Sequence, residues 1–224
     1  MSVAASLARV RGEILRVCAQ AGRDPGSVRL LPVSKGRSLE LVREALDCGV
    51  LELGENRVQE LAEKAEELAA QPVRWHLIGS LQTNKVKQLL RVPSLAFVHS
   101  LDRIKLADAL QAELAAQSRV LDVLVQVHAT GEATKHGIVP EAAAGLVAHV
   151  TGSCPNLALR GLMAMGPLEG DPLPVFGRVA RLCEELRQQH GLPLPVLSMG
   201  MSGDLAAAIE CGATLVRVGR AVFE

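Results

Sequence analysis

The chain has 224 residues, and its 24 Lys plus Arg balance its 24 Asp plus Glu, so the formal net charge is zero. That balance gives no electrostatic reason to bind nucleic acid or a membrane surface, and an aromatic content of 2% leaves few rings to stack on bases. A hydrophobic fraction of 49% is enough for a full core, built from aliphatic side chains. We therefore expect a small-molecule partner.

The cysteines and the first residues indicate a cytoplasmic protein. Five cysteines, an odd number without a C-x-x-C pair, are typical of reduced thiols rather than of a disulfide or metal framework. No metal site with credible ligand spacing is apparent. The first residues alternate apolar side chains with Arg and Glu, so we expect neither a signal peptide nor a membrane span.

Strands alternate with helices along the chain. After an amphipathic helix over Val3–Ala21, the first strand is predicted over Val28–Ser34, and a helix over Ser38–Cys48 then ends at Gly49. The further strands are predicted at Val50–Leu53, Arg74–Ile78, Leu95–His99, Leu121–Val127, Leu157–Met163, Pro195–Met199 and Thr214–Val218. The further helices are predicted at Glu55–Ala70, Asn84–Leu90, Arg103–Gln117, Glu141–Val150, Leu173–His190 and Gly203–Cys211.

This alternation predicts an α/β fold, a (β/α)8 barrel with parallel strands. An open doubly wound sheet usually carries a glycine fingerprint in its first turn, whereas the first strand here ends in Ser34-Lys35-Gly36. No low-complexity linker divides the chain. We therefore expect residues 1–224 to form a single domain.

Two glycine-containing turns after the last two strands predict a phosphate site. In Ser198–Asp204 the strand ends in Gly and Ser, and a helix is predicted to begin at Ser202 or Gly203 with Asp204 in its first turn. The next strand ends at Gly219, beside a cation. One such turn is more often only a tight turn, but two after strands seven and eight are where barrels commonly bind phosphate.

Lys35 is the candidate nucleophile at the other side of the barrel mouth. It follows an apolar strand, and barrel active sites lie at the C-terminal ends of strands. A single strand-end lysine is usually only solvated, but an amine facing a phosphate cradle is what pyridoxal 5'-phosphate (PLP) requires. Arg217 is then the candidate partner of the pyridine nitrogen, because a guanidinium keeps its protons and would leave that nitrogen unprotonated.

Six motifs, in order, resemble those of the pyridoxal phosphate homeostasis protein family over essentially the whole chain. They are Pro32–Lys35, Gly54–Glu60, Trp75–Lys85, Gly161–Met163, Ser198–Asp204 and Val216–Gly219. The resemblance implies a TIM barrel like the N-terminal domain of alanine racemase, the PLP fold-type III, without the C-terminal β domain. It also implies a role in keeping free PLP in check, with no established catalytic reaction.

The resemblance also assigns the cofactor contacts. It implies that Lys35 forms a Schiff base with PLP, that Ser202 and the amides around Gly219 and Arg220 hold the phosphate, and that Arg217 faces the ring nitrogen. The full set of expected contacts is Lys35, Asn56, His76, Met163, Ser198, Met201, Ser202, Arg217, Gly219 and Arg220.

The chain departs from the family pattern in three places. His128 stands where Asn is usual, Arg220 stands where Thr or Ser is common, and the sequence ends Phe223-Glu224 where a Gly and a short tail are usual. A guanidinium at position 220 replaces a hydroxyl contact and can pair with a phosphate directly.

Three functions remain open at this point. The preferred one is a monomeric PLP carrier that passes the cofactor to PLP-dependent apoenzymes or withholds it from them. The alternative is an amino-acid racemase of narrow specificity, with Lys35 as one base and His76, His99 or His128 as the other. Related racemases use a tyrosine as the second base, and this chain has no tyrosine. A third reading is a phosphate-binding barrel enzyme without a cofactor.

Other residues are expected to have structural roles. The charge-rich stretch Glu60–Glu67 is typical of the solvated face of an amphipathic helix. Met163, Met165, Met199 and Met201 are expected to pack around the barrel mouth.

Overall fold

The computed structural model describes residues 2–130 and 136–224. Eight parallel strands form one sheet in the order β1-β8-β7-β6-β5-β4-β3-β2. A bridge between Val33 and Gly54, with the Ser34 N–H donating to the Gly54 carbonyl at 3.0 Å, joins the two edge strands and nearly closes a barrel. The strands are β1 (Arg29–Pro32), β2 (Glu52–Glu55), β3 (Arg74–Leu77), β4 (Leu95–Leu101), β5 (Leu121–Val127), β6 (Leu157–Ala164), β7 (Val196–Ser198) and β8 (Leu215–Val218).

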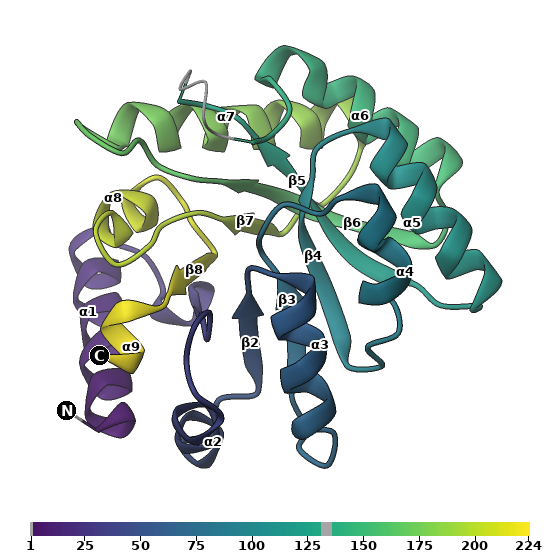
Figure 1. Cartoon of the computed structure of the whole chain (residues 1–224). Helices are drawn as coiled ribbons and strands as arrows, with labels where there is room; N and C mark the ends of the chain where they lie inside the picture. The colour runs from purple at the N-terminus through teal and green to yellow at the C-terminus, as the bar shows by residue number, and fades with distance from the viewer. Residues whose placement is uncertain (1, 131–135) are drawn as a thin grey trace.

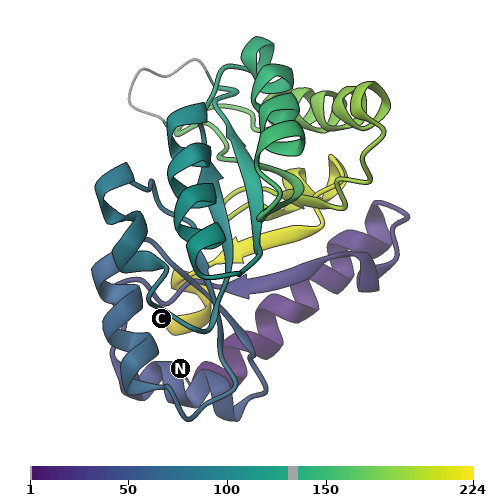
Figure 2. The same cartoon turned by 90° about the vertical axis from the view of Figure 1, so that its right-hand side faces the viewer.

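Helices surround these strands, as Figures 1 and 2 show. The α-helices are α1 (Val3–Gln20), α2 (Leu39–Asp47), α3 (Val58–Glu67), α4 (Val86–Leu89), α5 (Ile104–Ala116), α6 (Pro140–Ser153), α7 (Leu173–His190), α8 (Leu205–Glu210) and α9 (Arg220–Phe223). Two short 3-10 helices, η1 (Pro25–Ser27) and η2 (Thr83–Lys85), complete the elements of the described residues. None of the described helices has both the length and the apolar character needed to span a membrane. The predicted (β/α)8 barrel is confirmed.

The strands are buried on both faces, as parallel strands between helices and a barrel interior must be. Side chains such as Trp75, Leu77 and Val123 point outward and pack in one core with the surrounding helices. A second, smaller core fills the inside of the barrel, and its buried members are Leu31, Phe97, Leu124, Met163, Val196 and Leu215. The barrel is therefore a packed core with room for ligands only at its ends.

Helix α1 joins the two ends of the chain. Its buried residues Val3, Leu7, Val10, Ile14 and Val17 recur at helical spacing and form one apolar stripe. The helix packs beside α8 and α9, which Figure 1 shows in yellow next to the purple α1.

Most element boundaries differ from the sequence prediction by one to three residues, and three of the differences have a clear physical meaning. The second strand is Glu52–Glu55 rather than Val50–Leu53, because the Glu55 carboxylate has buried hydrogen-bond partners and can end a strand. The predicted helix over Asn84–Leu90 is divided between η2 and α4. A helix start at Ser202 or Gly203 is wrong, since α8 begins at Leu205 and the Asp204 carboxylate accepts a hydrogen bond from the Met201 N–H (2.5 Å).

Candidate functional site

A cavity of about 890 Å³ opens at the C-terminal ends of the strands. This volume lies in the range of small-molecule sites. Charged side chains outline it, with four cations against two carboxylates, which favours an anionic ligand. They are Lys35, Arg37, Arg217, Arg220, Asp204 and Glu224. The predicted contacts that line the cavity are Lys35, Asn56, Met163, Met201, Ser202, Arg217, Gly219 and Arg220.

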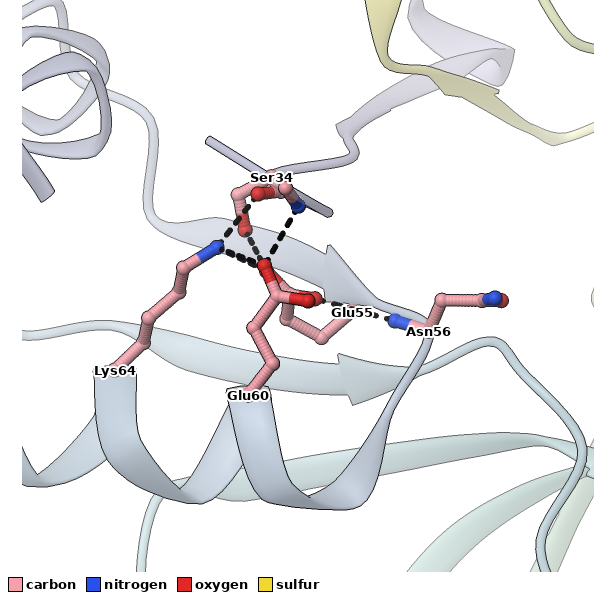
Figure 3. Close-up of polar contacts among 6 residues, drawn as sticks. Ser34, Glu55, Asn56, Glu60 and Lys64 are labelled. Carbon is pink, nitrogen blue, oxygen red and sulfur yellow. Dashed lines mark hydrogen bonds and ion pairs between the residues drawn. The ribbon is translucent and has the colours of Figure 1, made fainter. Parts of the chain in front are cut away.

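Lys35 lies in the turn after β1, with an exposed side chain that reaches the cavity. A buried network holds the backbone on both sides of it (Figure 3). The fully buried Glu55 accepts hydrogen bonds from the Ser34 hydroxyl and from Lys64 Nζ, each at 2.7 Å. Lys64 Nζ also donates to the Ser34 carbonyl (2.6 Å) and to Glu60 (2.8 Å). Glu60 in turn accepts from the Gly36 N–H at 2.6 Å.

The two carboxylates of this network respond differently to their surroundings. Burial raises the pKa of Glu55, against the hydrogen bonds from Lys64 and Ser34. Partial burial also acts to raise the pKa of Glu60, but the hydrogen bonds from Lys64 and Gly36 outweigh it and leave that pKa lowered. The prediction of a solvated face over Glu60–Glu67 is wrong at Lys64, which is 6% exposed. The network instead anchors the turn that carries Lys35.

Asn56 follows β2 and is pressed against Gly79 at the end of β3. A Cβ at position 79 would lie 2.0 Å from the Asn56 carbonyl oxygen and 2.6 Å from its Oδ1, closer than real Cβ atoms approach. Only glycine therefore fits at position 79. Its absence of a side chain lets Asn56 take its place in the cavity wall.

Two turns form the side of the cavity that was predicted to hold a phosphate. Within the described ranges, the backbone N–H groups of Ser202, Gly203, Gly219 and Arg220 donate no hydrogen bond to the protein. The helices that follow are only six and four residues long, so the attraction for an anion comes from these amides and the Arg220 guanidinium rather than from a long helix dipole.

Arg217 is 4% exposed and reaches the cavity from β8. Its Nη1 donates to Ser198 Oγ at 2.8 Å, and its Nη2 donates to the Ala164 carbonyl at 2.9 Å. Burial lowers the pKa of Arg217 to about 10, partly offset by Asp204, so it remains a cation at neutral pH.

Two of the predicted contacts, His76 and Ser198, do not line the cavity. Both are fully buried inside the barrel, where Ser198 holds Arg217 and His76 Nδ1 lies 2.9 Å from His99 Nε2. Sequence reasoning did not assign the network around Glu55 and Lys64. The spacing of four between Glu60 and Lys64 on one helix was the available signal.

One group of metal-ligand types appears among the described residues, away from the cavity. Asp108, His149 and Cys154 each offer an atom within 4.8 Å of the others. His149 Nε2 lies 2.7 Å from Asp108 Oδ1, so the two already form a hydrogen bond.

A family model and individual relatives place the chain in the same protein family. The family model described as "Alanine racemase, N-terminal domain" matches residues 6–224. A relative from Aquifex aeolicus called "Pyridoxal phosphate homeostasis protein" is 42% identical over 226 residues, covering 100% of this chain and 98% of that protein. A human protein of the same name is 37% identical and covers 100% of this chain and 86% of its own length.

Solved structures show the same fold. PipY from Synechococcus elongatus without PLP has a TM-score of 0.89 and 32% identity, and PipY with PLP bound has a TM-score of 0.86 and 31% identity. Both comparisons cover 100% of this chain and of PipY. An alanine racemase from Clostridium difficile shares the fold at 12% identity and a TM-score of 0.70, over 95% of this chain and 56% of the enzyme.

Proposed function

The chain belongs to the pyridoxal phosphate homeostasis proteins, within the alanine racemase N-terminal domain family, and on that premise we propose that it binds PLP in this cavity and acts in PLP homeostasis. A related structure carries PLP on the same fold. The observation that supports this most strongly is the placement of an exposed amine, Lys35, in a cavity that also holds a set of amides without protein partners.

The residues of the cavity fit the chemical groups of PLP. Lys35 is the residue that would hold the aldehyde, through a Schiff base that would release the aldehyde oxygen as water. The amides of Ser202, Gly219 and Arg220, with the Arg220 guanidinium, hold the phosphate. Bound PLP would supply an electron-withdrawing ring, and Arg217 is the residue that would face its nitrogen.

Arg217 limits that electron withdrawal. A guanidinium has only donors, and with a pKa of about 10 Arg217 keeps its protons at neutral pH. The ring nitrogen beside it stays unprotonated, which weakens the ring as an electron sink.

The positions of the three candidate histidines favour the carrier over the racemase. His128 is half-buried just after β5 and does not line the cavity. His76 and His99 are fully buried behind Arg217 and line no part of the cavity. Neither reaches a substrate on PLP as a second base without a rearrangement of the barrel core. We therefore favour a carrier that releases PLP to PLP-dependent apoenzymes, and we propose, as the sequence predicts, that it is a cytoplasmic monomer.

Absorption spectroscopy tests the proposed function. Wild type and a control, Lys87→Ala, are expected to develop a visible band on addition of PLP, whereas Lys35→Ala is not. Lys87 suits as a control because its side chain is 76% exposed on α4. A band of equal intensity in Lys35→Ala, or no band in wild type, would contradict the assignment.

A further inference from the structure

Polar side chains from five strands cross the inside of the barrel beneath the cavity. Arg217 Nη1 lies 2.8 Å from Ser198 Oγ, which lies 3.2 Å from His99 Nδ1. His99 Nε2 lies 2.9 Å from His76 Nδ1, and His76 Nε2 lies 3.8 Å from Glu52 Oε1. Glu52 lines a second cavity, of about 660 Å³, at the N-terminal ends of the strands. The row thus joins the two ends of the barrel.

The donors and acceptors fix the direction of this row. Arginine has no acceptor, so Ser198 Oγ accepts from Arg217 and has its own proton left for His99 Nδ1. His99 then carries its proton on Nε2 and donates to His76 Nδ1. His76 in turn carries its proton on Nε2, aimed at the Glu52 carboxylate.

The opposite direction leaves two groups unsatisfied. If His76 donated to His99 and His99 to Ser198, the serine proton would have no acceptor in this row. His76 Nε2 would then be a bare acceptor facing a carboxylate. This nitrogen is buried, has no hydrogen bond to the described residues and lies 3.8 Å from the Glu52 carboxylate, which attracts an N–H proton and repels a lone pair.

The ring of Phe97 holds the two imidazoles in place. It stacks on His76 at a centroid distance of 5.2 Å and an interplanar angle of 25°. It meets His99 edge-on at the same distance and 67°. The three rings come from the neighbouring strands β3 and β4, so sheet pairing itself sets the geometry.

Both imidazoles are neutral in this environment. Burial lowers the pKa of His76, although the nearby negative charge of the Glu52 carboxylate acts in the opposite direction. Burial lowers the pKa of His99 well below the usual range, and a proton gained by its neighbour His76 would lower it further. The other charged groups that act on the two rings are Arg29, Arg74 and Arg217.

We propose that His76 and His99 are positioning residues of the cofactor site, which act through Ser198 to fix the orientation of the Arg217 guanidinium. This role rests on the proposed function, because Arg217 matters as the partner of the PLP ring nitrogen. A Ser198 hydroxyl whose proton is held by His99 offers Arg217 only an acceptor. The guanidinium is thereby held by Ser198 and the Ala164 carbonyl, and its remaining N–H groups stay directed away from them.

Histidine nitrogen NMR on the protein without PLP tests the direction of the row. At pH 7 both His76 and His99 are expected to be neutral, with the proton on Nε2. His149, which pairs with Asp108 and whose side chain is 25% exposed, serves as the reference signal, assigned with His149→Gln. A proton on Nδ1 of either buried ring, or a charged ring, overturns the proposal.

A double-mutant cycle tests whether the effect passes through Arg217. His99→Leu is expected to weaken PLP binding by up to roughly tenfold, the upper end of what one lost neutral hydrogen bond costs. His99→Asn is expected to restore most of the affinity, because Oδ1 takes the place of Nδ1 as the acceptor for Ser198. In an Arg217→Leu background, His99→Leu is expected to have no further effect.

Additive effects of the two substitutions overturn the proposal. If His99→Leu does not fold, as judged by circular dichroism, Ser198→Ala replaces it with the same expectation. A wild type that binds no PLP contradicts the proposed function, while the NMR result still decides the direction of the row. If PLP binding depends on Lys35 but the His99 and Arg217 substitutions have additive effects, this inference is contradicted and the proposed function still stands.

Discussion

Lys35 and Gly79 act on the cofactor site in different ways. Lys35 supplies the reactive amine, and its neighbours Ser34 and Gly36 are hydrogen-bonded to the buried Glu55 and the partly buried Glu60. Gly79 contributes by lacking a side chain, which lets the backbone and side chain of Asn56 pack directly against it. The wall of the cavity thus depends on a contact that any larger residue removes.

Gly79→Ala is expected to destabilise the fold by about 1–3 kcal/mol, the usual cost of overpacking, and to weaken PLP binding by displacing Asn56. Urea unfolding measures the first effect and titration with PLP the second. Gly145→Ala is the matched control, since a Cβ there meets nothing within 4 Å, and it is expected to stabilise α6 by about 0.5–1 kcal/mol. If the two variants have the same free energy of unfolding and the same affinity for PLP, the contact between Gly79 and Asn56 contributes to neither.

Motifs predicted which residues gather at the mouth but not their depth within the barrel. Lys35, Asn56 and Arg217 line the cavity as expected, whereas His76 lies one layer below it. The alternation of side chains along a strand predicts which face of the sheet a residue lies on. Its position along the barrel axis depends on the tilt and register of the strands. Those depend on the pairing of all eight strands.

At the scale of elements, β2 and α3 form the support of the Lys35 turn. Glu55 ends the strand, and Lys64 reaches back from the helix to bond it. A buried ion pair adds little net stability, but loss of one partner leaves an uncompensated charge. The pair therefore matters for the position of the turn more than for the total stability.

Lys64→Met is expected to destabilise the protein by about 3–5 kcal/mol, because it leaves the buried Glu55 without its cation. Addition of Glu55→Gln to this variant is expected to recover part of the loss. Lys87→Met, which removes an exposed ion pair with Glu113, is the control and is expected to cost at most about 1 kcal/mol. Urea midpoints compare the four proteins. A Lys64→Met variant as stable as the control contradicts the role of the network.

Element boundaries could be predicted only where local signals act alone. Helix α7 was predicted as it is found, Leu173–His190, because Gly191 ends it in a left-handed conformation. The end of β2 was predicted two residues too early, because a glutamate such as Glu55 indicates a loop unless its buried partner Lys64 is known. The start of α8 was missed because Asp204 caps the preceding turn.

At the scale of the whole molecule, the barrel interior holds two neutral histidines away from water. Alternation of strands and helices was sufficient to predict the barrel, since parallel strands with helical crossovers have few other arrangements. A polar row through its centre could not be predicted, because it joins residues from five strands. It makes the stability of the barrel depend on pH.

The free energy of unfolding is expected to fall as the pH drops below about 6.5, the ordinary pKa of a histidine in an unfolded chain. The pKa values of His76 and His99 are lowered in the folded state, so the unfolded chain binds protons first and is favoured in acid. The two histidines contribute their full stabilisation at a pH above their pKa in the unfolded chain. This stabilisation is lost as the pH falls through their lower pKa values in the folded protein. Urea unfolding gives the free energy of unfolding at pH 7.5 and at pH 5. The loss between these two pH values is expected to be smaller in His99→Asn than in wild type. An equal loss in both proteins would show that His99 does not contribute to the pH dependence of stability.

The covalent link between Lys35 and PLP is the central claim, and reduction with sodium borohydride tests it most directly. The protein is loaded with PLP, reduced, digested and analysed by mass spectrometry. The pyridoxyl group is expected on the peptide that contains Lys35 and on no other. A label carried by Lys64, Lys85 or Lys87 in place of Lys35, or no label at all, would contradict the account.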